Sequence, residues 1–325
     1  MAAGHWQRQS GLTIVELMVS MTLGLLVTAI GAGLLASGKT SYLFQDESIE
    51  LQENGRFALE IIARSVRQAG FQSWNEGETP LTAEAYASPD IVGMDARSLK
   101  SNTVALESVE NNAVNGSDVL ALRFFGAGTG ESGDGSILNC AGLGVGASAS
   151  SESEINRGWS IFYVATDATG EPELRCKYKG KTAWTSDAIV RGVESFQVLY
   201  GIDLDADGLA DRFLSANQVD ALDDALTLVG ENAPTRNQNR QARSHWKKVV
   251  AVRVAMLLRG ASELGAEIVE RKHALFGSAY CDRSHTADKG SCLGEKDFQP
   301  KVRNRLRKIF ETTISIRNRY ALPNT

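Results

Sequence analysis

A short acidic stretch in the middle of the chain carries the residues best suited to bind a cation. Aspartates stand at alternate positions in Asp203, Asp205 and Asp207, and Gly208 follows directly. Carboxylate oxygens are hard ligands that suit Ca²⁺, and glycine permits the sharp turn that wraps a backbone around an ion. The sequence therefore predicts a calcium-binding loop.

The spacing in this stretch matches the first nine positions of an EF-hand-type calcium loop. The oxygen ligands would fall at positions 1, 3, 5, 7 (a backbone carbonyl) and 9, which are Asp203, Asp205, Asp207, Leu209 and Asp211. Position 12 is Leu214, so the usual bidentate acid is missing and affinity should be weak. Another acid has to complete the shell, and Asp220, Asp223 and Asp224 are the nearest downstream. The alternative is a solvated acidic turn.

Four cysteines offer a second kind of chemistry. They are Cys140, Cys176, Cys281 and Cys292, and no two of them have the C-x-x-C spacing of a zinc site. An even number of cysteines in an exported chain is typical of disulfides. Pairing Cys281 with Cys292 would close a short loop, and pairing Cys140 with Cys176 a longer one. The spacing leaves the other two connectivities open.

Glu16 is the only charged residue between Leu12 and Gly38. The stretch Leu17–Leu35 is apolar apart from one serine and two threonines. A helix of about 24 residues spans the ~30 Å hydrocarbon core of a bilayer, so residues 12–38 are predicted to cross a membrane once. A carboxylate inside a membrane helix is costly, so it needs a partner and usually has a role. The alternative is that Glu16 lies near the interface and stays solvated.

The junction before this segment is distinctive. It reads Gly11-Leu-Thr-Ile-Val-Glu16 after a short polar leader, and the apolar segment does not end in an ordinary secretory cleavage site. This resembles the type III signal of type IV prepilins and type II secretion pseudopilins. The resemblance implies that a prepilin peptidase cuts after Gly11 and methylates Leu12, although phenylalanine is more usual there. The free amine of Leu12 could then pair with Glu16 of a neighbouring subunit.

The helical pattern continues beyond the apolar segment. No proline occurs before Pro80, and apolar or small residues recur every three or four positions from Leu51 to Ala69. Gly70 suits a helix C-cap. One helix is therefore predicted from Leu12 to about Ala69, which is about 58 residues or ~87 Å long.

After Gly70 the pattern changes to short β-like runs separated by polar loops. Strands are predicted at Asp118–Phe125, Trp159–Thr166, Glu173–Tyr178, Val193–Ile202, Lys247–Arg259 and Thr312–Arg317. The run Lys247–Arg259 is apolar on both faces except at Arg253, which predicts a central, doubly covered strand. Residues 220–243 are polar, with a short helix expected at 221–229. The predicted fold class is α+β, a long helix packed on an antiparallel sheet.

Two further segments resemble the PilW family of minor pilins. One is Gly192–Gly201, which precedes the aspartate loop, and the other is the ending Phe310–Asn318. The resemblance implies a leader at 1–11, a helix at 12–70 and a globular domain at 71–325. It also implies a single-pass inner-membrane subunit with a periplasmic C-terminal domain that later enters a pilus.

The expected partners follow from the same resemblance. They are other minor pilins, the major pilin, a large tip adhesin, the inner-membrane assembly platform and the prepilin peptidase, in a complex that primes pilus assembly near the tip. A J-like pseudopilin of type II secretion, or a calcium-dependent adhesin merely anchored by the helix, is the alternative. A net charge of -5 argues against nucleic-acid binding. No nucleophile elbow, Walker loop or H-E-x-x-H motif occurs, so we do not expect an enzyme.

Overall fold

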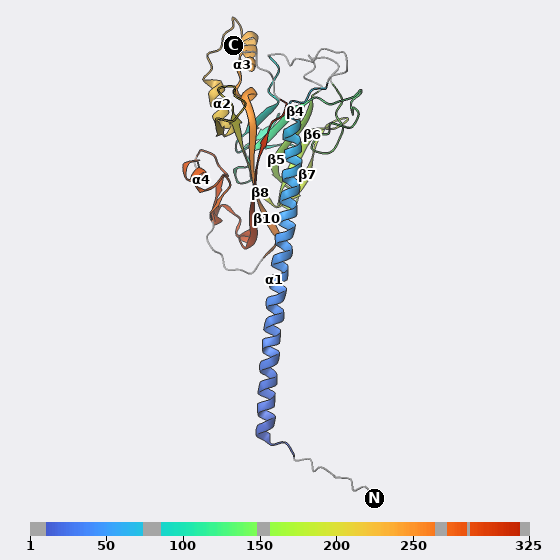
Figure 1. Cartoon of the computed structure of the whole chain (residues 1–325), viewed down its shortest axis with the longest axis vertical. Helices are drawn as coiled ribbons and strands as arrows, with labels where there is room; N and C mark the ends of the chain where they lie inside the picture. The colour runs from blue at the N-terminus through green and yellow to red at the C-terminus, as the bar shows by residue number, and fades with distance from the viewer. Residues whose placement is uncertain (1–10, 74–85, 148–156, 264–271, 285–286, 319–325) are drawn as a thin grey trace. The chain divides into compact units, whose positions relative to one another are not determined.

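The computed structural model describes most of the chain, shown in Figure 1. The described residues are 11–73, 86–147, 157–263, 272–284 and 287–318. The chain divides into two compact units, Met1–Ile49 and Glu50–Thr325, and each is described by itself.

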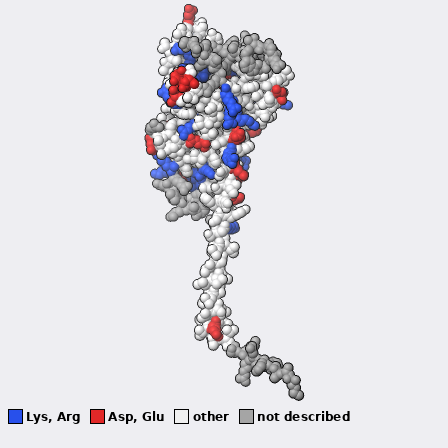
Figure 2. Space-filling model, in the orientation of Figure 1, with Lys and Arg blue, Asp and Glu red and all other residues white. Residues whose placement is uncertain are grey.

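The first unit holds the N-terminal part of helix α1 (Ile14–Gln68). Large hydrophobic side chains between Leu12 and Leu35 are 47% to 79% exposed. An 18-residue stretch of this helix has a mean hydropathy of 2.0 and is not buried. The helix is therefore long and apolar enough to cross a membrane. Figure 2 shows the same stretch as a nearly uncharged surface. The helix was predicted from Leu12 to about Ala69, and its observed ends differ by only one or two residues.

The C-terminal turns of α1 belong to the second unit and bury an apolar stripe. Ala58, Ile62 and Val66, spaced three or four residues apart, have no exposed surface and join the main hydrophobic core. Gly55 allows this close packing, because a Cβ there would lie 2.5 Å from the ring of Phe310. The helix ends before Gly70, which adopts a positive φ of 70°, as its predicted role of C-cap requires.

One antiparallel sheet of the second unit has five strands. In spatial order they are β1 (Ile91–Met94), β4 (Val119–Phe124), β5 (Gly158–Thr166), β6 (Pro172–Lys179) and β7 (Trp184–Arg191). Strands β4, β5 and β6 were predicted to within one or two residues at each end. The edge strands β1 and β7 were not predicted.

The second antiparallel sheet has four strands. In spatial order they are β13 (Arg305–Ser315), β10 (Val249–Glu263), β8 (Val193–Ile202) and β9 (Arg212–Leu214). Strand β10 lies between β13 and β8. Val254 and Met256 face the main core, whereas Ala255 and Leu257 face a second apolar cluster. The prediction of a central strand covered on both faces is therefore confirmed, as is the α+β class, with two main sheets in place of one.

Short elements complete the second unit. They are β2 (Ser98–Leu99), β3 (Val109–Glu110), β11 (His273–Ala274), β12 (Cys292–Leu293), α2 (Ala216–Asp224), α3 (Ala233–Arg243), α4 (Ser278–Ser284) and 3₁₀ turns at Val114–Gly116, His245–Lys248, Glu295–Asp297 and Pro300–Val302. The helix expected at 221–229 instead begins at Ala216, because Ser215 and Gln218 cap it there. The polar stretch 220–243 also contains α3, which follows the N-cap residue Asn232.

Candidate functional site

The junction at the start of α1 places Glu16 against Thr13. The backbone N–H and the hydroxyl of Thr13 both donate to Glu16 Oε2 at 3.0 Å, and the N–H of Glu16 donates to Thr13 Oγ1 at 3.3 Å. This reciprocal arrangement is a capping box, which satisfies donors at the first turn of a helix. Gly11 and Leu12, just outside the helix, are exposed. Cleavage at this junction and a role of Glu16 in assembly stay predictions.

The aspartate loop connects β8 to β9 and gathers part of the predicted ligand set. Carboxylate oxygens of Asp203, Asp205 and Asp211 lie within 4.8 Å of one another. The carboxylate of Asp203 accepts the N–H of Gly208 at 2.8 Å, and Gly208 has the positive φ of 89° that the predicted turn needs. Asp207 lies outside this group, and its carboxylate accepts the N–H of Leu209 at 2.7 Å instead.

The downstream acids that were expected to complete the loop have other partners. Asp220 accepts the indole N–H of Trp246 at 2.8 Å. Asp223 accepts the Ser244 hydroxyl at 2.5 Å and lies 2.7 Å from Nδ1 of His245, and Asp224 pairs with Arg240 at 3.1 Å. Among the described residues, none of the three joins the loop's carboxylate group.

Both disulfides close the shorter of the possible loops. Cys140 is joined to Cys176 and Cys281 to Cys292, with Cα–Cα distances of 6.0 and 5.3 Å that suit a disulfide. The first bond connects the loop after β4 to strand β6, and the second connects α4 to β12. The two other connectivities that the spacing left open do not occur.

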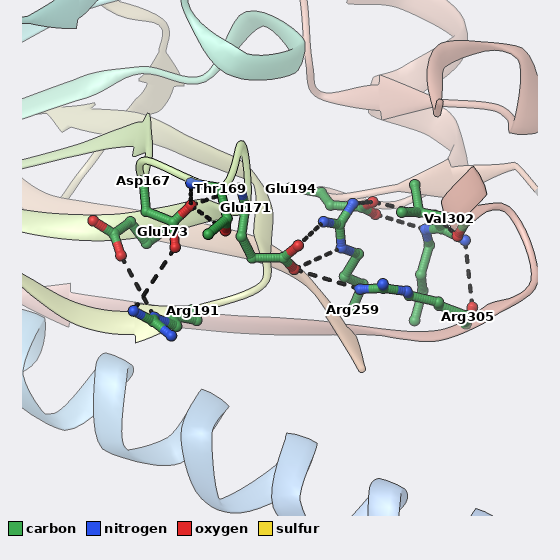
Figure 3. Close-up of polar contacts among 10 residues, drawn as sticks. Asp167, Thr169, Glu171, Glu173, Arg191, Glu194, Arg259, Val302 and Arg305 are labelled. Atoms are coloured by element: carbon green, nitrogen blue, oxygen red, sulfur yellow. Dashed lines mark hydrogen bonds and ion pairs between the residues drawn. The ribbon is translucent and has the colours of Figure 1, made fainter. Parts of the chain in front are cut away.

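A buried ion-pair network joins the two sheets (Figure 3). Glu194 on β8 is 2% exposed and binds Arg259 at 3.0 Å and Arg307 at 2.6 Å. Arg259 also binds Glu171, in the turn between β5 and β6, at 2.6 Å. Arg305 lies 3.5 Å from the same glutamate. Because both glutamates have cationic partners, this network has a structural role in fixing strands of different sheets.

A second acidic group lies in the interior, and sequence reasoning missed it. Carboxylate oxygens of Asp95, Asp118 and Asp288 come within 4.8 Å of one another. These side chains belong to residues that are 5%, 1% and 3% exposed. Asp95 directly follows β1, Asp118 directly precedes β4, and Asp288 lies between α4 and β12. We call these three residues the buried carboxylate cluster.

Backbone donors hold two of these carboxylates in place. Asp95 accepts the N–H groups of Ala216 and Asn217, both at 2.8 Å, at the N-terminus of α2. Asp118 accepts the N–H of Ala96 at 3.0 Å and that of Val198 at 2.9 Å. Such donors, and the positive end of a helix dipole, favour the ionised form of a carboxyl.

Burial has the opposite effect from those donors, because it disfavours the ionised form of a carboxyl. Burial, with the nearby charges of Asp95 and Asp288, raises the pKa of Asp118 well above its usual range. Burial also raises the pKa of Asp288 to about 6. Within the described part of the chain, no lysine, arginine or histidine forms an ion pair with any of the three. Among the described residues the cluster therefore has no cationic partner, unlike the network around Glu194.

Comparisons with known protein families match two parts of the chain. Residues 161–318 match the family described as type IV pilus-assembly protein W, and residues 6–32 match the prokaryotic N-terminal methylation motif. No curated protein matches the chain at a significant level. A solved type IV-like pilin from Thermus thermophilus is 14% identical with a TM-score of 0.37, over 83% of this chain and 98% of that chain, which is too distant to support an argument. Together the two matches support a type IV pilus minor pilin, similar to the PilW family over residues 161–318, with a prepilin signal at its N-terminus.

Proposed function

We propose that this chain is a minor pilin that helps to prime type IV pilus assembly and sits at or near the pilus tip. The observation that carries the proposal is the combination of a methylation motif on an exposed apolar helix with a PilW-type domain in the same chain. Pilins are structural, non-enzymatic subunits, so the proposed activity is assembly rather than catalysis.

Processing is the first step of the proposed function. A prepilin peptidase would cut after Gly11 and methylate the amine of Leu12. The exposure of both residues, directly before the first turn of α1, supports this access. Intact-mass analysis of the chain from cells should give residues 12–325 plus one methyl group. A chain that keeps residues 1–11 in the presence of the peptidase would contradict the proposal, and Gly11→Val, which should stay uncut, is the matched control.

Docking into a filament is the second step. The new amine of Leu12 would pair with Glu16 of a neighbouring subunit, which neutralises both charges inside the bilayer and sets axial register. Within its own chain, Glu16 accepts hydrogen bonds from Thr13. Docking would replace these bonds by the ion pair with the neighbour's amine. The two disulfides support exposure of the globular unit to an oxidising compartment, which is the periplasm before assembly and the cell surface after it.

Calcium binding by the aspartate loop is a separate proposal. The three carboxylate oxygens within 4.8 Å support it, and the turn at Gly208 has the required backbone conformation. The missing acid at position 12 and the position of Asp207 outside the group favour weak affinity, of the kind found in extracellular modules.

A gene deletion tests the proposed function most directly. The surface pili and the secreted proteins of a deletion strain should be measured side by side. The minor-pilin proposal expects lost pili with normal secretion, restored by the wild-type gene but not by Glu16→Ala. Normal pili with lost secretion would identify a pseudopilin instead. Normal pili and secretion, with surface binding that survives Glu16→Ala, would identify an anchored adhesin.

A further inference from the structure

The buried carboxylate cluster is assembled by the pairing of two strands and one C-terminal loop. Strands β1 and β4 are antiparallel, and their register places Met94 opposite Val119. Asp95 and Asp118 therefore extend side by side from the same end of the strand pair. Asp288 reaches them from the loop that the Cys281–Cys292 disulfide closes.

Two buried oxygen atoms at this place have no hydrogen-bond partner among the described residues. One is Oδ1 of Asp288, whose other oxygen accepts the Tyr280 hydroxyl at 2.8 Å. The other is the hydroxyl of Tyr200, a residue that is 1% exposed. A buried polar atom without a partner is costly and calls for an explanation, such as a bound ion.

Several contacts place the Tyr200 hydroxyl beside the cluster. Tyr200 lies two residues after Val198 on β8, hence on the same face, and the N–H of Val198 binds Asp118. A Cβ on Gly93, which lies on β1 two residues before Asp95, would be 1.9 Å from the hydroxyl oxygen. Burial first, and then the charges of Asp118 and Asp95, raise the pKa of Tyr200 well above its usual range.

One bound cation would account for all of these observations. Three carboxylates and a hydroxyl are hard oxygen ligands, which are the donors that Ca²⁺, Mg²⁺ and Mn²⁺ prefer. A divalent cation would supply the counter-charge that the described residues do not provide. We propose that Asp95, Asp118 and Asp288 form a buried binding site for a hard divalent cation, foremost Ca²⁺, with the Tyr200 hydroxyl beside it.

The site would join parts of the fold that are far apart in the sequence. Asp95 already binds the N-terminus of α2, Asp118 binds the backbone of β8, and Asp288 belongs to the disulfide-closed loop. The same loop contacts β8 directly, because the Ser195 hydroxyl donates to the carbonyl of Gly290 at 3.0 Å. A cation at the cluster would thus fix the C-terminal loop against both sheets, which is a structural function independent of the aspartate loop.

The test separates the two acidic sites in a two-by-two set of full-length proteins in detergent. The set contains the wild type, a loop variant (Asp205→Asn with Asp211→Asn), a cluster variant (Asp288→Asn) and the combination of both. Bound calcium is measured by mass spectrometry of the metal after equilibration with CaCl₂ and desalting. The melting temperature of each protein is measured in EDTA and in CaCl₂, with MgCl₂ and MnCl₂ as comparison ions.

The proposal expects the loop variant to retain one Ca²⁺ per chain and to gain about 5 °C or more in calcium over EDTA. Adding Asp288→Asn to the loop variant should remove both effects. In EDTA this variant should melt at or above the wild-type temperature, because it takes a charge out of the cluster, and this result shows that it folds. A loop variant that binds no metal and melts equally in all four solutions would overturn the proposal, and the carboxyls would then share protons.

A terbium probe locates the ion. The ring of Trp246 lies 4.7 Å from the ring of Tyr200, centroid to centroid, so excitation of these rings should sensitise luminescence from Tb³⁺ bound at the cluster. The loop variant should keep this signal and the cluster variant should lose it. Sensitised luminescence that persists in Asp288→Asn but disappears in the loop variant would place the ion in the aspartate loop instead.

Discussion

The aspartate loop and the buried carboxylate cluster each bring three carboxylates within 4.8 Å, but in opposite surroundings. The loop draws its acids from nine consecutive residues, and Asp205 and Asp211 are exposed. The cluster draws its acids from three distant segments, and all three are buried. Two charges about 5 Å apart repel by about 1 kcal/mol in water but by several kcal/mol at the effective dielectric of a protein interior.

The difference explains which site needs a counter-charge in order to be stable. Solvent screens the repulsion among the loop's carboxylates, so the loop does not need a counter-charge in order to fold. The cluster is desolvated, so each ionised carboxyl has to be offset by donors, protons or a cation. The following changes test this contrast, beginning with the largest expected effect.

Removal of a carboxylate should be far more costly in the cluster than in the loop. Asp118→Ala leaves the buried N–H groups of Ala96 and Val198 without an acceptor, so it should lower the free energy of unfolding by about 4 kcal/mol in EDTA. Asp205→Ala, at an exposed site, should change it by less than about 0.5 kcal/mol. Urea titration in detergent measures both. Equal losses would show that burial does not distinguish the sites. The loss of unfolding free energy for Asp118→Asn, which keeps one acceptor, should lie between the losses for the two alanine variants.

The pH dependence of stability should also separate the two regions. The pKa of Asp288 is raised to about 6 by burial, whereas an unfolded aspartate titrates near about 4. Between these values the folded chain holds a proton that the unfolded chain has released, so stability in EDTA should fall as pH rises through this window. The full loss, about 3 kcal/mol, is present above about pH 6.

Unfolding free energies from pH 4 to pH 7 measure this effect. Asp288→Asn should flatten the decline, and Asp211→Asn in the loop should leave it unchanged. A decline that persists undiminished in Asp288→Asn would assign the pH dependence to other groups.

A buried cation provides the mirror image of the cluster. Lys177 on β6 has no exposed surface, donates to Thr103 Oγ1 at 3.1 Å, and has a pKa lowered to about 8 by burial. The unfolded chain holds this proton up to about pH 10, so the penalty is full below pH 8 and disappears as pH rises. Lys177→Met should therefore stabilise the protein by about 2 kcal/mol at pH 7. Thermal melts at pH 7 and pH 10 measure the gain, and a gain that does not shrink at pH 10 would contradict the assignment.

Local features of the fold could be predicted from the sequence because local residues determine them. The long apolar and amphipathic run gives α1, and the ten-residue β-like run Val193–Ile202 gives β8 with the predicted ends. The edge strand β1 has only four residues, and β7 presents polar side chains to solvent, so neither stands out by hydrophobicity. The aspartate loop was recognisable because its ligands lie within nine residues.

The buried carboxylate cluster could not be predicted for the converse reason. Asp95, Asp118 and Asp288 each look like an ordinary polar residue at the end of a strand or in a loop. Only the β1–β4 register and the closed C-terminal loop bring them together. One weak signal existed, because Asp118 directly precedes the run Val119–Phe124, which is apolar except at Arg123, and a carboxylate buried with such a run needs a partner.

The smallest expected effect concerns which aspartates of the loop bind the ion. Asp205 belongs to the loop's carboxylate group and Asp207 does not. If calcium binds in this arrangement, Asp205→Asn should abolish a calcium-dependent gain in melting temperature of about 1–3 °C, whereas Asp207→Asn should leave it nearly intact. Both variants should match the wild type in EDTA, and the Asp288→Asn background keeps the cluster from contributing. Equal loss in both variants would instead support the full EF-hand-type ligand set, with Asp207 turning inward when the ion binds.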